Sequence, residues 1–322
     1  MNSNKPVSYK QEKPVYYLGL LGNVDATILN LELGGDFSIE RRNKQDIVKL
    51  LSLLFSHSEL DVDCDIEDKF QYDRDDQWVY VISKEYNYWY FDTPKGAPIE
   101  EVVNAHHGMS QHDSLIKRPV RLLRLFSEGD IEVSISCFYR IDDDGPFLVA
   151  GYEQGRVLER DNRFSVDESI WPEINKFLRI KHLSLLENYL QLSFNQFEAS
   201  YDLNDEQMAF LALNIALEIL FNDGRQDISY KISRGTAALI GKTKDEALEI
   251  YRRIKKLYGK RSALVHSGDA KITEQETHEL RGYVRRCLRR LFDANIQKDV
   301  LSEHLTISGF GRVALPKRKK TI

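Results

Sequence analysis

The chain has 322 residues, more than one typical domain and enough to bury a sizeable core. Hydrophobic residues make up 42% and charged residues 30%, which excludes a disordered or fibrous protein. The net charge of −5 argues against a polycation along the whole length. This average hides an asymmetry, because residues 1–200 carry 22 Lys+Arg and 34 Asp+Glu, whereas residues 201–322 carry 23 and 16.

The cysteines and the N-terminal residues indicate the cellular compartment of the protein. Cys64, Cys137 and Cys287 lie far apart, form no CxxC pair, and as an odd number cannot all pair within one chain. We therefore expect a reduced, cytoplasmic protein. The first residues lack the apolar stretch of a signal peptide, and no run approaches the roughly 20 apolar residues of a membrane span.

Strand signals dominate the first half of the chain. Ile131, Val133 and Ile135 alternate with polar residues, as in a half-buried strand, and Asp144-Gly145 marks a turn into a partner strand. Further apolar or alternating runs predict strands over 15–21, 27–33, 78–82, 86–91 and 147–152. One amphipathic helix is predicted over 46–55. We expect a β-rich domain over 1–160 that senses or recognises a ligand.

Helical periodicity takes over from Trp171 onward. We expect a linking helical segment over 161–200, a helical bundle over 201–297, and an irregular basic tail over 298–322. Helix starts are predicted at Asn204, Asp227, Thr243 and Thr273, the last two as full capping boxes. Residues 208–221 are apolar on nearly all sides, which predicts the central helix. The predicted fold class is α+β, a β-rich domain followed by an all-α bundle.

The segment with the most chemistry covers residues 258–268. It places Arg261 and His266 five positions apart, within a stretch, 251–290, that holds 12 Lys+Arg and 4 Asp+Glu. An arginine grips phosphate with two hydrogen bonds and stays charged, and a histidine moves protons near neutral pH. His266 could remove the 2′-hydroxyl proton of RNA while Arg261 stabilises the charge that develops on phosphorus. Such a pair could cleave RNA without a metal.

This spacing alone is weak evidence for a catalytic site, because Arg-x4-His occurs by chance in many chains. In the ordinary interpretation His266 packs against or caps its helix end and Arg261 is a solvated charge. The surrounding elements are therefore needed to decide between the two interpretations.

Several short elements accompany the pair. They are Ala216-Leu217-Glu218, Ile228–Arg234, Ala237-Ala238-Leu239, Leu257-Tyr258, Arg261-Ser262 and Val265-His266 before Gly268. With these elements, residues 170–295 resemble the HEPN superfamily, and specifically the ApeA-type HEPN domain. The resemblance covers about two fifths of the chain.

The resemblance implies a function. HEPN domains are small helical bundles that usually dimerise and bring two Arg-x4–6-His motifs into one cleft. Many are metal-independent endoribonucleases of toxin–antitoxin and phage-defence systems, and they leave 2′,3′-cyclic phosphate ends. The resemblance therefore implies that Arg261 and His266 are catalytic, that no cofactor is needed, and that the chain forms a homodimer through the HEPN domain. A phage or antitoxin trigger would bind the N-terminal domain.

One departure keeps two alternatives open. The residue after the arginine is often Asn, Asp or His in active members, and here it is Ser262. Serine can still hydrogen-bond phosphate or orient His266. The alternatives are a catalytically silent module that binds RNA or nucleotide, and a structural dimer scaffold in which His266 is buried away from any cleft.

Three further residues are candidates for supporting roles. Glu218 lies in the apolar central helix, where a carboxylate needs a partner, so it could hold Arg234 or Arg261. A rim position paired with any lysine is an equally good interpretation. Tyr258 could stack on a base, although tyrosine at this helical spacing is usually a core residue.

A basic helix face is the predicted RNA track. Arg281, Arg285 and Arg289 recur every four residues, and with Lys260 they could follow an RNA backbone. A solvated face or a dimer rim is the alternative. The terminal run 316–320 is a second candidate phosphate-binding arm.

No metal site is predicted. The acidic stretch 61–68 lacks the glycine and the final glutamate of a calcium loop. His106, His107 and His112 have no second ligand cluster with zinc-like spacing.

Overall fold

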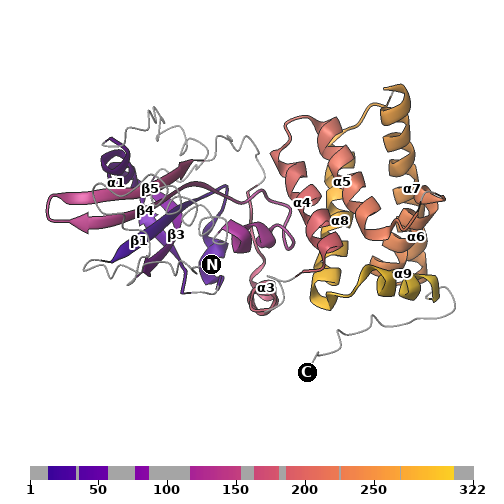
Figure 1. The fold of residues 1–322 in the computed structure, drawn as a ribbon, viewed down its shortest axis with the longest axis horizontal. Coiled ribbons are helices and arrows are strands. Elements are labelled where there is room, and N and C mark those ends of the chain that lie inside the picture. Colours follow the sequence, from indigo (N-terminus) through magenta and orange to yellow (C-terminus); the bar gives the residue numbers. More distant parts are fainter. Residues whose placement is uncertain are drawn as a thin grey trace, which may run out of the picture. The chain divides into compact units, whose positions relative to one another are not determined.

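The computed structural model describes residues 14–33, 36–56, 77–86, 117–153, 163–180, 186–224, 226–268 and 270–307. The chain divides into two compact units, Met1–Arg179 and Ile180–Ile322. The first contains a β-sheet and the second is helical, so the predicted α+β class is confirmed (Figure 1).

A five-stranded antiparallel sheet forms the first unit. Its strands are β1 (Val15–Gly22), β2 (Ser38–Asn43), β3 (Trp78–Tyr86), β4 (Glu132–Asp142) and β5 (Gly145–Glu153). Their order in the sheet is β2-β3-β1-β4-β5. The predicted turn at Asp144-Gly145 joins β4 to β5, and Gly145 has a φ of 121°, a conformation that favours glycine.

Both faces of this sheet are covered. On β1, Tyr17 and Leu21 belong to one core cluster, while Leu18 and Leu20 belong to another. Helix α1 (Lys44–Ser56) covers the second cluster, and residues 117–123, which are helical, contribute to the first. The sheet therefore separates two small cores.

Two local predictions in this unit are wrong. Residues 27–33 form no strand, because a 3-10 helix, η1 (Ala26–Asn30), begins where the Asp25 carboxylate accepts a hydrogen bond from the Thr27 amide. Strand β2 was not predicted, since its sequence SIERRN has no apolar alternation. Residues 87–91, with the acidic stretch 61–68 and the histidines at 106, 107 and 112, lie outside the described residues.

The predicted linking segment 161–200 is divided between the units. Helices η3 (Glu168–Ile170) and α3 (Trp171–Leu178) belong to the first unit. Helix α4 (Asn188–Asp202) belongs to the bundle, where Ser193 Oγ donates to the Ala216 carbonyl at 3.0 Å. The bundle therefore begins before residue 201.

The remaining bundle helices are α5 (Glu206–Phe221), α6 (Ile228–Ile240), α7 (Lys244–Ser267), α8 (Glu274–Ala294) and α9 (Lys298–Ile307). Helix α5 is central, as predicted, and packs against α4, α6, α7 and α8 (Figure 1). The predicted irregular tail is wrong over Lys298–Ile307, which forms α9 and buries Leu301 and Leu305. Residues 308–322, including the basic run 316–320, lie outside the described residues.

The predicted helix starts are only partly correct. The cap of α5 is Asp205 rather than Asn204, and Asp227 occupies the cap of α6 without a side-chain capping bond. Thr243 accepts from the Glu246 amide, but the Glu246 carboxylate accepts from the Lys242 amide instead of completing a box. At Thr273 both bonds of the capping box are present.

Removing the Thr273 cap should destabilise the helical unit. Thr273→Ala leaves the Glu276 amide without its acceptor, and we expect a loss of about 1 kcal/mol in the free energy of unfolding. Urea unfolding followed by circular dichroism at 222 nm measures it. Thr273→Asp keeps an acceptor and should stay close to wild type; equal losses in both variants would contradict this role.

Candidate functional site

Arg261 and His266 both lie in the last two turns of α7. The helix starts at the Thr243 cap and ends at Gly268, whose φ is 72° and whose amide donates to the Leu264 carbonyl. The glycine suits this ending because the left-handed conformation strains other residues. The pair is therefore held on a regular helix and not in a loop.

Glu218 of α5 connects Arg261 to the bundle. Arg261 Nη2 lies 3.0 Å from Glu218 Oε1, and the Tyr258 hydroxyl donates to the same oxygen at 3.1 Å. The Arg261 guanidinium carbon lies 5.6 Å from the centre of the Tyr258 ring. Of the two partners considered for Glu218, the structure selects Arg261, and it places Tyr258 beside it. These three residues are called the Glu218 cluster below.

The Glu218 cluster keeps Tyr258 protonated and orients the Arg261 guanidinium. Burial and the negative charge of Glu218 raise the pKa of Tyr258, and the Arg261 charge opposes this only in part. Tyr258 therefore stays a neutral phenol that donates to the carboxylate. The buried Arg261 Nε has no hydrogen-bond partner among the described residues. The guanidinium is thus oriented by one carboxylate and keeps a donor unused.

Arg261 and His266 of one chain do not share a helix face. Five residues along an α-helix correspond to a rotation of about 140°, so the two side chains leave α7 in different directions. Ser262 lies one turn before His266, on the same side of the helix. The His266 side chain is exposed. The scaffold alternative expected a buried imidazole, and the single chain does not show one.

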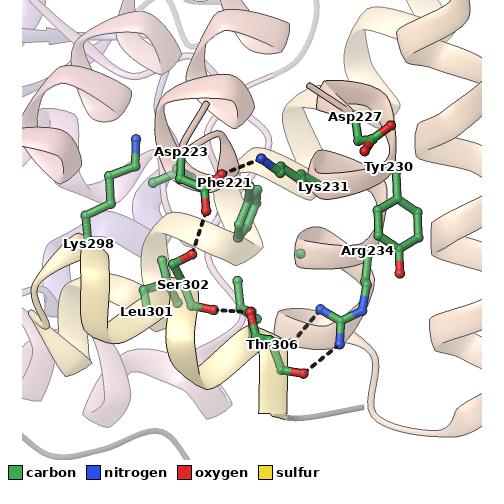
Figure 2. A pocket seen from close by; sticks show the side chains of 13 residues that line it. Phe221, Asp223, Asp227, Tyr230, Lys231, Arg234, Lys298, Leu301, Ser302 and Thr306 are labelled. Atoms are coloured by element: carbon green, nitrogen blue, oxygen red, sulfur yellow. Dashed lines mark hydrogen bonds and ion pairs between the residues drawn. The ribbon is translucent and has the colours of Figure 1, made fainter. Parts of the chain in front are cut away.

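Arg234 lies away from the Glu218 cluster. Its guanidinium donates to the carbonyls of Leu305 at 2.5 Å and Thr306 at 3.2 Å, at the end of α9 (Figure 2). A cation at a helix C-terminus satisfies carbonyls that the helix leaves unpaired. The supporting role predicted for Arg234 beside Glu218 is therefore wrong, and Arg234 anchors α9 instead.

Arg234 also lines a pocket of about 590 Å³ between the end of α5, α6 and α9. Across it, Lys231 pairs with Asp223 at 2.6 Å, and Ser302 donates to the same carboxylate at 2.9 Å (Figure 2). These bonds join α9 to the rest of the bundle. Sequence reasoning missed them because α9 was expected to be irregular.

The exposed arginine face predicted on α8 is wrong for two of its members. Arg281 is 6% exposed and donates to the Ser200 carbonyl at 2.8 Å and to Ser200 Oγ at 3.1 Å. Arg285 is 7% exposed and donates to the Tyr201 hydroxyl at 3.0 Å. Both therefore join α8 to α4, and of the predicted series only Arg289 is partly exposed.

Lys260, the fourth predicted RNA contact, is also engaged. Its Nζ lies 2.7 Å from Glu276 Oε2 and donates to the Lys271 carbonyl at 3.2 Å. About two turns earlier in α7, Arg253 binds both carboxylate oxygens of Glu279. These two bridges join α7 to α8. The i, i+3 spacing of the two glutamates on α8 is the signal that could have predicted them.

The described residues contain neither a metal-binding cluster nor a membrane-spanning helix. Among the described residues, no group of three His, Cys, Asp or Glu side chains could hold a metal ion, and no described helix is long and apolar enough to cross a membrane. Comparisons with protein-family models, curated proteins and solved structures found no significant match.

Proposed function

We propose that the helical unit is a HEPN-type, metal-independent endoribonuclease with Arg261 and His266 as its catalytic residues. The observation that carries the proposal is the Glu218 cluster, which holds one arginine on the helix that also presents an exposed histidine. The Arg261 side chain remains 22% exposed, and an oriented guanidinium suits a phosphate oxygen. The sequence resemblance to HEPN domains supports the same assignment.

The reaction follows from the chemistry of the two side chains. Neutral His266 removes the 2′-hydroxyl proton, and the 2′-oxygen attacks the adjacent phosphorus. Arg261 stabilises the charge on the pentavalent intermediate. The 5′-oxygen leaves with a proton from an imidazolium, so the products are a 2′,3′-cyclic phosphate and a 5′-hydroxyl.

A homodimer completes this scheme. The two side chains diverge by about 140° around α7, so one chain does not readily direct both at one phosphate. A symmetric interface would place α7 of one copy against α7 of the other and combine Arg261 and His266 from both. The second His266 would then supply the proton for the leaving group.

The wider biological role is part of the same proposal. Phage defence or toxin-like growth arrest fits an RNA-cleaving bundle, with the β-rich unit binding a phage or antitoxin trigger. A cytoplasmic location fits the free, buried thiols of Cys137 and Cys287.

Digestion of total RNA by the purified chain tests the proposal. We expect His266→Ala and Arg261→Ala to lower the cleavage rate by at least about 100-fold, because each removes a group that acts in the transition state. Cleavage should persist in EDTA, leave cyclic phosphate ends, and spare DNA. The His278→Ala variant carries the same chemical change outside the site and should cleave RNA at the wild-type rate. Undiminished cleavage by both site variants would overturn the assignment.

A silent RNA-binding module is the second candidate. The observation that favours it is the ion pair of Arg261 with Glu218, since the carboxylate competes with phosphate for the guanidinium. Ser262 after the arginine points the same way. RNA binding without new ends in the digestion would select this candidate.

A further inference from the structure

The last seventeen residues of α7, Tyr251–Ser267, contain six cations and no Asp or Glu. Three of these cations face carboxylates of neighbouring helices: Arg253 faces Glu279, Lys260 faces Glu276, and Arg261 faces Glu218. The cations on the inner sides of the helix are therefore neutralised.

The other three cations are Arg252, Lys255 and Lys256. All three are exposed, and none has a carboxylate partner within the described parts of the chain. They lie on one face of α7, since they are three and four residues apart. The bundle thus pairs the partly buried cations with carboxylates and leaves a positive strip facing solvent.

This strip continues to His266. Gly259, Ala263 and His266 follow Arg252 and Lys256 at the same helical spacing, and each of the three is exposed. A Cβ added to Gly259 would have no atom within 4 Å. Two small residues therefore leave the surface low between the cations and the histidine. We call Arg252, Lys255, Lys256, Gly259, Ala263 and His266 the α7 strip.

Aromatic rings lie beside the cationic end of the α7 strip. Tyr230 of α6 is 53% exposed and packs edge-on against Tyr251, with ring centres 6.4 Å apart. Lys255 Nζ lies 6.0 Å from the centre of the Tyr251 ring. The bases of a single strand can stack on exposed aromatic rings. An acidic protein surface has no bases, and the bases of a duplex are already stacked on one another, so neither ligand would use these rings in this way.

We propose that single-stranded RNA lies along the α7 strip, with its phosphates on Arg252, Lys255 and Lys256, a base on Tyr230, and its cleavable end at His266. This inference rests on the proposed function and adds the path of the substrate. From Arg252 to His266 the helix rises about 21 Å, which accommodates about six stacked nucleotides. The path replaces the α8 face, whose Arg281 and Arg285 are buried.

Binding of a labelled 20-nucleotide RNA tests the path. The full-length chain with His266→Ala is the reference, so that cleavage does not interfere. Adding Arg252→Gln and Lys256→Gln removes two phosphate contacts, and we expect binding about 20-fold weaker in 0.1 M salt. The slope of log affinity against log salt concentration should become shallower by about 1.4.

Two further variants separate position from net charge. Lys271→Gln with Arg290→Gln removes two exposed charges of the same unit that lie outside α7, and this variant should bind RNA like the reference. Gly259→Glu adds a negative charge in the low part of the strip without a clash and should weaken binding. Tyr230→Ala should weaken the binding of single-stranded RNA but leave the binding of a duplex unchanged.

The outcomes separate the two proposals. Weaker binding by the strip variants, with normal binding by the off-strip control, supports the path. Equal binding by strip variants and reference overturns the path alone if wild type still cuts RNA. A wild-type chain that neither binds nor cuts RNA overturns both.

Discussion

Replacing Gly129 with alanine should destabilise the β-rich unit by about 3 kcal/mol, at the upper end of what overpacking usually costs. A Cβ on Gly129 would lie 2.2 Å from the Phe164 Cα and 2.3 Å from its amide nitrogen. Backbone atoms cannot rotate away as a flexible side chain can. One of the two segments must therefore move.

Phe164 has little freedom to move. It is fully buried, and its amide donates to the Asn23 carbonyl at 2.8 Å. Asn23 in turn donates to the Asp130 carbonyl at 3.0 Å, next to Gly129. A shift that admits the methyl group therefore breaks this bonded cluster.

Tryptophan fluorescence can measure this loss separately. Trp78, Trp89 and Trp171 all belong to the first unit, so fluorescence during urea unfolding reports on that unit alone. Gly282→Ala is the matched control, because a Cβ there meets no atom within 4 Å. It should leave the fluorescence midpoint unchanged and stabilise α8 by about 0.5–1 kcal/mol. An unshifted midpoint in Gly129→Ala would contradict the packing argument.

Replacing Arg281 with alanine should cost the helical unit about 3 kcal/mol. The change removes two hydrogen bonds from a charged donor, one to the carbonyl and one to the hydroxyl of the buried Ser200. It also removes the guanidinium that lies 4.6 Å from the centre of the Tyr201 ring, and leaves a cavity. The expected effect is structural.

Arg290→Ala is the control on the same helix. Arg290 is exposed, and a surface substitution of this kind changes stability by less than about 0.5 kcal/mol. Urea unfolding followed at 222 nm compares the two variants. If Arg281→Ala proves as stable as Arg290→Ala but loses RNA binding, Arg281 is a contact residue and its place in the core is incorrect.

Periodicity located the buried faces of the helices but not their widths. On α8, Leu280, Val284 and Leu288 were expected inside and are buried. Arg281 and Arg285 follow these residues by one position, about 100° around the helix, and such positions lie at the margin of a buried face. Only the presence of Ser200 and Tyr201 on α4 decides that they are inside. That contact is between distant segments, and no local pattern encodes it.

The candidate site was predictable in part for the same reason. A carboxylate in an apolar helix needs a partner, so a bond between Glu218 and an arginine could be expected from the sequence. The sequence does not decide whether the partner is Arg234 of α6 or Arg261 of α7, because both helices pack on α5. The capping box at Thr273 was predictable because all its groups lie within four residues. Helix α9 was not predictable in this way, because a helix of ten residues is stable only when it packs against the rest of the bundle.

The end of α7 has a consequence for the dynamics of the site. The buried residues of this helix are Ile250, Ile254 and Leu257, and none of the described residues after Leu257 in α7 is buried. Helices gain most of their stability from packing, and Gly259 lowers the helix propensity of this segment further. Local opening of these last turns should therefore cost far less free energy than global unfolding, and their amides should exchange hydrogen fastest in α7. The segment that carries Arg261 and His266 would gain its full order when a partner copy or RNA covers it, so that binding and ordering of the site are coupled.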